Sequence, residues 1–478
     1  MGIASREMRP VPLIGPPSEN VEDAQVDRWA STIIDGLPII VEDKLHLLKR
    51  PGLVPFVDLG THLPIDGLYW WDRQRVVLAV SAGRVWKILD SAGTRQEITG
   101  SSELRSSQLV SFANDGSTCV MANGGRMVHT DLSTLTTMAD ADAPTNVTHV
   151  AYVDGTMVAN EVGSARAHFS EDDIFDWPAL NIFTAEANPD DLVAIQEAYR
   201  ELILLGRESV EFWRYDGQTP FSAISGSAQP FGTEAPDSLA NVGGVWIWLD
   251  HKRRLVTMQG RVVVPVSSPY DRIIQRFTSV NDAVGFTTMI DGHPIYLLNF
   301  PTDRQTLAFN YATKVWHKWG YWDIERASYS RYRGQTYTYA RSWNAHLVGD
   351  YSNGIIYKAS RDYYTDNGNP IRTLLRTGHI SHGAAGTKRS NLFRLLCKRG
   401  LANDAVADPK VMLRYRTDNG ARWSNERWAS LGRTGDHLNH IDWRRNGIYR
   451  TRQYELIHSD PSDFVVMGAQ EDVELLGR

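Results

Sequence analysis

A short turn followed by a β-branched or aromatic strand recurs along the chain from about residue 66, and this repeat restricts the folds available to the sequence. Successive turns stand roughly 39–48 residues apart, which is the blade period of a β-propeller. A second strand follows most of the turns, and in the last unit it arrives later, as "GIIYK". The turns are "WDRQRVVL" near Arg73, "NDGSTCVM" at Asp115, "VDGTMVAN" at Asp154, "AYRELILL" near Tyr199, "VGGVWIWL" at Gly243, "IDGHPIYLL" at Asp291 and "YRGQTYTY" at Arg333.

These turns predict hairpins that cover one another. Asp-Gly and Gly-Gly pairs supply the positive φ that tight hairpins require. One hairpin alone is marginally stable in water, whereas several arranged around an axis bury each other's faces. We therefore predict an all-β protein with a β-propeller-like domain of six or seven blades over residues 28–371. The alternative is one long β-sandwich in which the spacing of the turns is accidental.

The two ends of the chain differ from this repeat. Residues 1–27 are rich in proline and polar side chains and lack periodicity, which predicts an extended arm that is ordered only where a partner holds it. After Thr373 the sequence changes to short strands separated by turns, so residues 372–478 are expected to form a small C-terminal β-sandwich or barrel.

Charge is unevenly distributed between these regions. From Arg372 onward there are 18 lysines and arginines against 12 acids, a net charge of +6. The whole chain carries −6, which leaves −12 for the residues before Arg372. An acidic body and a basic C-terminal domain suggest two surfaces with different partners.

Cysteine usage and hydropathy exclude several classes of protein. Cys119 and Cys397 lie far apart, so neither a disulfide framework nor a thiolate metal site is expected. No apolar signal-peptide core follows the first charged residues, and no stretch of about 18 apolar residues is present. We therefore expect a protein of a reducing compartment with no membrane insertion.

The octapeptide "RTDNGARW" at residues 416–423 is close to the Asp box of sialidase-type propellers. In that motif the aspartate, here Asp418, accepts backbone N–H bonds within the turn. Gly420 would permit a left-handed residue and Trp423 would pack beneath. A sialidase further needs an arginine triad, a nucleophilic tyrosine and its glutamate, and nothing local marks them. The motif therefore predicts a structural hairpin.

Other patterns also fall short of a reactive site. The H-x-x-H pairs lie in strand-like segments, where residues three apart point to opposite faces, so they do not predict a metal site. The paired acids lie in loops, where solvated carboxylates are the common case, and no P-loop or GxSxG motif is present. The sequence thus predicts no catalytic residue, cofactor or metal. The H-x-x-H pairs are His379/His382 and His437/His440, and the paired loop acids are Asp140/Asp142, Asp172/Asp173 and Asp190/Asp191.

The tryptophan-rich segment "WHKWGYWD" places Trp316, Trp319 and Trp322 three residues apart, but Gly320 and the neighbouring strand formers argue against a helix. We expect these tryptophans to pack between blades rather than to stack on nucleic-acid bases.

Residues 169–250 carry an ordered series of elements: "FS", "AEANPDD", "LILLGRESVEFW" and "GTEAPDSLANVGGVWIWL". This series resembles the packaged-DNA stabilisation proteins of short-tailed bacteriophages, also called tail nozzle or tail-hub proteins. "LLKRPGL" upstream, and "DRIIQRF" and "YLLNFPTDRQTLAFNYATKVWHKW" downstream, follow in the expected order. The resemblance extends over most of residues 29–476.

The resemblance implies a structural virion protein rather than an enzyme. Members of this family form a homohexameric ring below the portal and its adaptor ring, extend the channel for viral DNA, and help to retain the packaged genome. They also mount tail fibres, spikes or a needle. The implied location is the virion tail, after assembly in the cytoplasm of the bacterial host.

The basic C-terminal domain suggests a contact surface within this picture. We expect its cations to face either DNA or an acidic neighbouring ring. Two other functions remain open: a virion-borne propeller glycan hydrolase, which requires clustered acids at one propeller mouth, and a non-viral propeller scaffold. The contact candidates are Lys388, Arg389, Arg394, Lys398 and Arg399.

Overall fold

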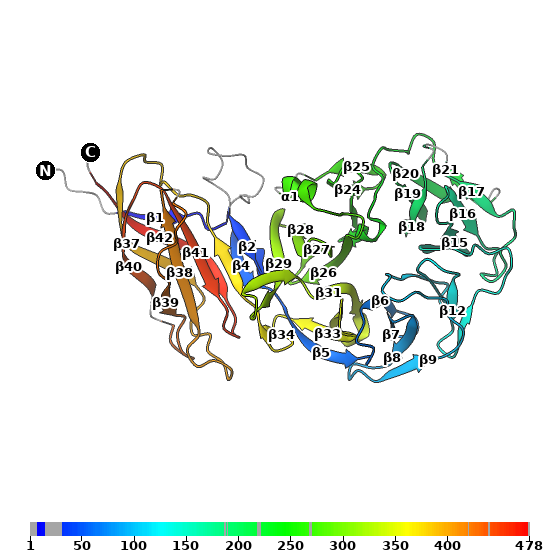
Figure 1. Ribbon diagram of the computed structural model, residues 1–478, viewed down its shortest axis with the longest axis horizontal. Helices are drawn as coiled ribbons and strands as arrows, with labels where there is room; N and C mark the ends of the chain where they lie inside the picture. The colour runs from blue at the N-terminus through cyan, green and yellow to red at the C-terminus, as the bar shows by residue number, and fades with distance from the viewer. Residues whose placement is uncertain are drawn as a thin grey trace.

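The computed structural model describes residues 7–14, 31–185, 188, 190–217, 221–266, 270–418, 420–437 and 440–476. The regular secondary structure of this part of the chain is almost entirely β-strand, with one short helix, α1 (Asp271–Arg276), and the single turns η2 (Pro236–Ser238) and η3 (Arg341–Trp343). Figure 1 shows a β-sandwich at one end of the long axis and a ring of blades at the other.

The described residues form seven propeller blades, each an antiparallel sheet that meanders through four strands. Blades 1–3 are β6 (Ile65–Trp71), β7 (Val76–Ser81), β8 (Arg84–Ile88) and β9 (Arg95–Ile98); β10 (Ser111–Asn114), β11 (Cys119–Ala122), β12 (Val128–Thr130) and β13 (Leu135–Thr137); and β14 (Val150–Val153), β15 (Thr156–Asn160), β16 (Arg166–Phe169) and β17 (Ile182–Thr184). Blades 4–6 are β18 (Leu192–Ala198), β19 (Glu201–Gly206), β20 (Val210–Tyr215) and β21 (Phe221–Ala223); β22 (Ala240–Val242), β23 (Val245–Leu249), β24 (Leu255–Gln259) and β25 (Val262–Pro265); and β26 (Val284–Ile290), β27 (His293–Phe300), β28 (Gln305–Asn310) and β29 (Val315–Asp323).

Blade 7 closes the ring with a strand from the other end of the propeller sequence. Its first three strands are β31 (Gly334–Ala340), β32 (Ala345–Asp350) and β33 (Ile355–Ser360), and the fourth is β5 (Gly52–Asp58), which pairs antiparallel with β33. The hairpin of β34 (Thr365–Asp366) and β35 (Asn369–Pro370) extends this sheet beyond β5. β5 thus joins the first and last blades covalently and by backbone hydrogen bonds.

Apolar clusters between neighbouring blades hold the ring together. All six residues of β7 are buried, because blade 7 covers one face of this strand and blade 2 the other. Trp316 lies in the cluster between blades 5 and 6, and Trp319 in the cluster between blades 6 and 7. Their predicted packing between blades is confirmed, whereas Trp322 is half-buried and stacks against Arg372.

The propeller confirms the expected repeat and excludes the single long sandwich. Six of the seven predicted turns join the first strand of a blade to the second, as at Asp154 and Gly155, both with positive φ. The turn at Arg333 does not, because it precedes the first strand of blade 7. The joining turn of that blade is η3, whose C-cap Asn344 is left-handed.

The sandwich packs two sheets around a core that includes Phe393, Trp443 and Leu456. One sheet has the order β3-β4-β42-β37-β40, with β1 also paired to β42, and the other contains β2-β36-β41-β38-β39. The strands are β1 (Glu7–Val11), β2 (Thr32–Ile34), β3 (Gly36–Val41), β4 (Lys44–Lys49), β36 (Thr373–Arg376), β37 (Lys388–Cys397), β38 (Lys410–Thr417), β39 (Arg427–Ser430), β40 (Ile441–Tyr449), β41 (Arg452–His458) and β42 (Val465–Leu475).

The N-terminal strands differ from the expected division of the chain. Residues 32–49, expected in the propeller domain, form β2–β4 and pair with strands of the sandwich sheets. The predicted extended arm over residues 1–27 is described only at residues 7–14. There β1 pairs with β42 of the same chain, and Val11 and Leu13 enter the sandwich core.

One continuous sheet connects the two bodies. β2 pairs parallel with β29 of blade 6 and antiparallel with β36 of the sandwich, so hydrogen bonds run from β26 to β39. β30 (Ser328–Arg331) also pairs with β29. Because backbone bonds cross the junction, the propeller and sandwich are joined by a sheet rather than by a free linker.

Candidate interaction surfaces

A buried arginine fixes the junction between propeller and sandwich. Arg50 Nε donates to Asp35 Oδ1 at 2.6 Å, and its Nη1 and Nη2 donate to Asp366 at 3.0 and 2.5 Å. Nη2 also donates to the carbonyl oxygen of Gly320 at 2.7 Å, and the guanidinium lies over the rings of Trp319 and Tyr332. The side chain is fully buried, so this contact links the turn before β3, blade 6 and the β34 hairpin.

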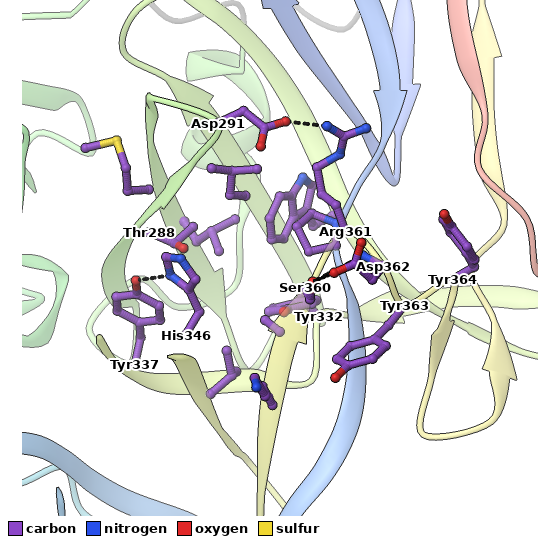
Figure 2. Close-up of a pocket in the computed structure, with 18 of the residues that line it drawn as sticks. Thr288, Asp291, Tyr332, Tyr337, His346, Ser360, Arg361, Asp362, Tyr363 and Tyr364 are labelled. Atoms are coloured by element: carbon purple, nitrogen blue, oxygen red, sulfur yellow. Dashed lines mark hydrogen bonds and ion pairs between the residues drawn. The ribbon is translucent and has the colours of Figure 1, made fainter. Parts of the chain in front are cut away.

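A cavity of about 610 Å³ lies beside this junction, between blades 6 and 7. Figure 2 shows Tyr337 and His346 on one side of it and the ion pair of Arg361 with Asp291 on another. Tyr337 and His346 Nδ1 are 2.7 Å apart. Burial raises the pKa of Tyr337 and lowers that of His346, so both remain neutral near pH 7. The size suits a small ligand, but these polar groups are occupied with one another.

A second cavity, about 270 Å³, lies where first strands of several blades meet around the propeller axis. Burial raises the pKa of Asp66 to about 7, and its Oδ2 accepts a hydrogen bond from the Ser107 amide at 3.1 Å. Asp237 is exposed to the cavity but surrounded by protein, which raises its pKa to about 6. Burial lowers the pKa of His149 to about 4. Within the described residues no cluster of three or more such side chains forms a metal site.

The five predicted cationic contact residues do not form one surface. β37 alternates between core and solvent, so Lys388 points inward, where its Nζ donates to the carbonyl oxygens of Ala384 and Gly386. Its side chain is buried and is therefore unable to reach a partner.

The other four lie further out, each in a different setting. Arg389 contacts Glu474 at 3.4 Å, Arg394 binds Asp442 through two hydrogen bonds, and Lys398 lies 3.7 Å from Asp463. Arg399 is half-buried just after the strand. Each described ion pair reduces the positive charge that this surface presents.

The octapeptide "RTDNGARW" forms the expected turn, but the hydrogen-bond partners of Asp418 and the neighbours of Trp423 differ from those expected. Asp418 Oδ1 accepts hydrogen bonds from the amides of Arg450 and Thr451 at 2.7 and 2.8 Å, so it caps the β40–β41 turn rather than its own. Asp418 itself is the left-handed residue, with φ 52°, whereas Gly420 has no positive φ. Trp423 is half-buried and lies against arginines instead of beneath the turn.

Those arginines belong to a surface that the sequence analysis missed. Side chains of β36, β38 and β41 alternate, and the register places Arg376, Glu455 and Arg414 side by side on the outer face of the sandwich. Both arginines bind Glu455, and together with Arg416 they surround the Trp423 ring at 5.0–5.3 Å. The two-residue spacing in "RYR" places Arg414 and Arg416 on the same face of a strand. The sequence does not predict which strands lie beside it, so it does not predict that Arg376 and Glu455 join them.

The same face continues toward blade 6. The Arg372 guanidinium lies 4.3 Å from the centre of the Trp322 ring. Trp428 of β39 stands opposite Met412 of β38 in the sheet and is 52% exposed. We call this surface the arginine–tryptophan face; it consists of Trp322, Arg372, Arg376, Arg414, Arg416, Trp423, Trp428 and Glu455. Four positive charges and one negative charge make it basic.

The remaining motifs have structural roles. His382 Nε2 lies 2.8 Å from Glu471, and His437 Nδ1 lies 3.2 Å from the carbonyl oxygen of Arg399. Asp140 accepts the Trp177 amide and Asp191 pairs with Arg207, so these loop acids fix turns. Cys119 and Cys397 are both buried and unpaired.

Family models match this chain along two successive segments. The model described as "Bacteriophage P22 Gp10, beta-propeller" covers residues 46–364, and "Bacteriophage P22 Gp10, beta-sandwich" covers residues 373–474. The chain belongs to the bacteriophage P22 Gp10 family. It is accordingly a structural virion protein of the phage tail, in agreement with the resemblance drawn from residues 169–250.

Solved structures of other propellers share only a loose likeness with this Gp10-family chain. YCF48 from Cyanidioschyzon merolae is 11% identical, with a TM-score of 0.42, over 65% of this chain and 98% of that one. BamB from Moraxella catarrhalis is 12% identical, with a TM-score of 0.39, over 70% and 97%. A search of curated proteins finds no match. In the described residues no helix has the length and apolar character needed to span a membrane.

Proposed function

We propose that this Gp10-family chain forms a hexameric nozzle ring below the portal and its adaptor, extends the DNA channel, and helps to retain the packaged genome. The ring also serves as the mount for tail fibres, spikes or a needle. It acts mechanically rather than catalytically, and it assembles in the cytoplasm of the bacterial host.

The observation that carries this proposal is the consecutive match of propeller and sandwich to the same family over residues 46–364 and 373–474. The junction supports it physically. A continuous sheet and the buried Arg50 cluster give a rigid body, as needed by a wall that holds pressurised DNA. A hinge between the two parts would instead allow the ring to open.

The four outward cations remain candidates for contact with DNA or with an acidic neighbouring ring. Arg389 and Lys398 have side chains 48% and 61% exposed, so each can exchange its carboxylate partner for a phosphate or another carboxylate. We expect the combined substitutions Arg389→Gln, Arg394→Gln and Lys398→Gln to loosen DNA retention or assembly. Unchanged infectivity and DNA content would exclude this role.

The decisive experiment examines particles of a phage that lacks this gene by electron microscopy and DNA quantification. Complementation with the intact gene is the control. Heads that package DNA and then lose it, with a missing ring below the adaptor, are the expected result. Stable full heads with complete tails that fail to infect would contradict the proposal and favour a host-surface enzyme, which hydrolysis of host polysaccharide by purified protein would reveal.

A further inference from the structure

An acidic and apolar corner lies on blade 3, in the loop between β16 and β17 and at the first residue of β17. Four carboxylates within six residues are exposed there, and Leu180 is 89% exposed, Phe175 41% and Ile182 38%. Within the described part of the chain no lysine or arginine forms an ion pair with these carboxylates. We call this surface the acidic corner; it consists of Glu171, Asp172, Asp173, Phe175, Asp176, Leu180 and Ile182.

The acidic corner is held in a fixed shape. Trp177 is buried, its amide donates to Asp140 Oδ2 at 2.9 Å, and its Nε1 donates to the carbonyl oxygen of Ile174. Asn181 Nδ2 binds Glu171 Oε1 at 2.9 Å. A loop anchored in this way loses little conformational entropy on binding, which favours an interface.

The arginine–tryptophan face matches this corner in both charge and apolar character. Its arginines are held by Glu455 and by stacking on Trp322 and Trp423, so it is also fixed in advance. Arginine and tryptophan are enriched in the energetically dominant parts of protein–protein interfaces. Duplex DNA, by contrast, offers phosphates but no exposed base for Trp428 to stack upon. The composition therefore favours a protein partner over DNA.

The two surfaces lie toward opposite ends of one chain. Figure 1 shows β38 and β41 in the sandwich at the left and β16 and β17 at the far side of the propeller. They are unable to meet within one molecule, but they are available to meet between two. Such a contact joins unlike surfaces, and repetition of a contact of this kind produces a closed ring or an open filament.

We propose that the arginine–tryptophan face of one copy binds the acidic corner of the next copy, head to tail. This inference rests on the proposed ring and identifies its subunit contact. Carboxylates of the corner bind Arg372 and Arg416, while Leu180 and Phe175 cover Trp428.

Cross-linking in assembled particles tests the contact directly. Trp428→Cys and Leu180→Cys are combined in one chain, purified virions are treated with a flexible bismaleimide, and products are separated on denaturing gels. A ladder of multimers of this chain is expected from the double variant and from neither single variant. The natural cysteines, Cys119 and Cys397, are buried, so we expect no reaction of their thiols with the bismaleimide. A matched control combines Trp428→Cys with Val262→Cys, since Val262 is 62% exposed on blade 5. Absence of the ladder, an equal ladder in this control, or products with another virion protein overturns the proposal.

Charge exchange supplies a second test. Arg372→Glu with Arg416→Glu spares the two arginines that neutralise buried Glu455, so the fold is expected to survive. This variant, or Asp172→Lys with Asp173→Lys, should reduce incorporation into particles by about tenfold, because like charges then face each other. All four substitutions in one chain should restore incorporation. Circular dichroism checks that each variant folds, and failure of folded quadruple variants to recover contradicts the contact.

The outcomes separate this inference from the proposed function. If complete particles with the double variant give the ladder, and particles that lack this gene nevertheless keep their DNA, the subunit contact is retained and genome retention is excluded. Leaking heads together with no ladder would retain the nozzle and exclude this interface.

Discussion

Arg50 donates two hydrogen bonds to Asp366, at 3.0 and 2.5 Å, although 316 residues separate them in the chain. The pair is buried where β4 leaves the sandwich and β5 enters blade 7. Because Arg50 also binds Asp35 and the carbonyl oxygen of Gly320, it is the centre of the junction. Removing the guanidinium leaves two buried carboxylates without their cation, which is far more costly than losing an exposed pair.

The first prediction follows from this pair. Arg50→Met should lower the free energy of unfolding by about 3–5 kcal/mol. The matched control Arg207→Met removes an ion pair with Asp191 whose arginine is 58% exposed, so its effect should stay below about 1 kcal/mol. Denaturant unfolding of the purified chains measures both. Equal losses in the two variants would contradict the role assigned to Arg50.

The second prediction concerns acid stability. Burial lowers the pKa of His317, a fully buried residue of β29, to about 3. In the unfolded chain its pKa is about 6.5. The unfolded state therefore binds a proton first as the pH falls, so the contribution of His317 to stability is complete above pH 6.5 and is lost between pH 6.5 and 3.

His317→Leu removes this titratable group and fills its buried position with an apolar side chain. Each pKa unit corresponds to about 1.4 kcal/mol, so the wild-type chain should lose several kcal/mol more than the variant between pH 7 and 4. Denaturant unfolding at both pH values gives the difference. His149 has a lowered pKa as well, but it is present in both chains and cancels. Parallel pH profiles would show that His317 is not the group responsible.

The third prediction separates buried from outward cations on β37. Lys388→Met leaves the carbonyl oxygens of Ala384 and Gly386 without a donor and should cost about 1–3 kcal/mol. Arg389→Gln, on the neighbouring outward position, should cost less than about 1 kcal/mol. Thermal unfolding of both variants provides the comparison, and a smaller loss for Lys388→Met than for Arg389→Gln would be inconsistent with the buried position.

Local sequence features predicted the local structure well. Tight turns require positive φ, and in blades 2, 3, 5 and 6 an Asp-Gly or Gly-Gly pair marks the first hairpin, as at Asp291 and Gly292. The pair Asp66-Gly67 instead lies inside β6. The turn of blade 7 lacks such a pair. There "RSWN" forms η3 and Asn344 takes the left-handed position, whereas Gly334, at the predicted turn, begins strand β31.

Pairing between distant segments was not predictable. Residues 32–49 contain no pattern that predicts the pairing of β2 with β29 and β36, because the complete fold decides which strands are neighbours. The cationic residues of β37 show the same limit. Alternation and a bulge between Ser390 and Leu392 decide which of them face solvent. The arginine–tryptophan face likewise needs the register of three strands, which a single sequence does not contain.

The last prediction returns to "RTDNGARW". Asp418 is left-handed and its carboxylate caps the β40–β41 turn through the amides of Arg450 and Thr451. Asp418→Gly keeps the backbone conformation but removes the acceptor, so it should cost about 1 kcal/mol and speed hydrogen exchange at both amides. Asp418→Asn keeps an acceptor oxygen and tolerates positive φ, so its loss should be smaller. Thermal unfolding with exchange measured by mass spectrometry distinguishes the two. If Asp418→Asn were as destabilising as Asp418→Gly, the cap would not explain why this aspartate is there, and the motif would need a role beyond the turn.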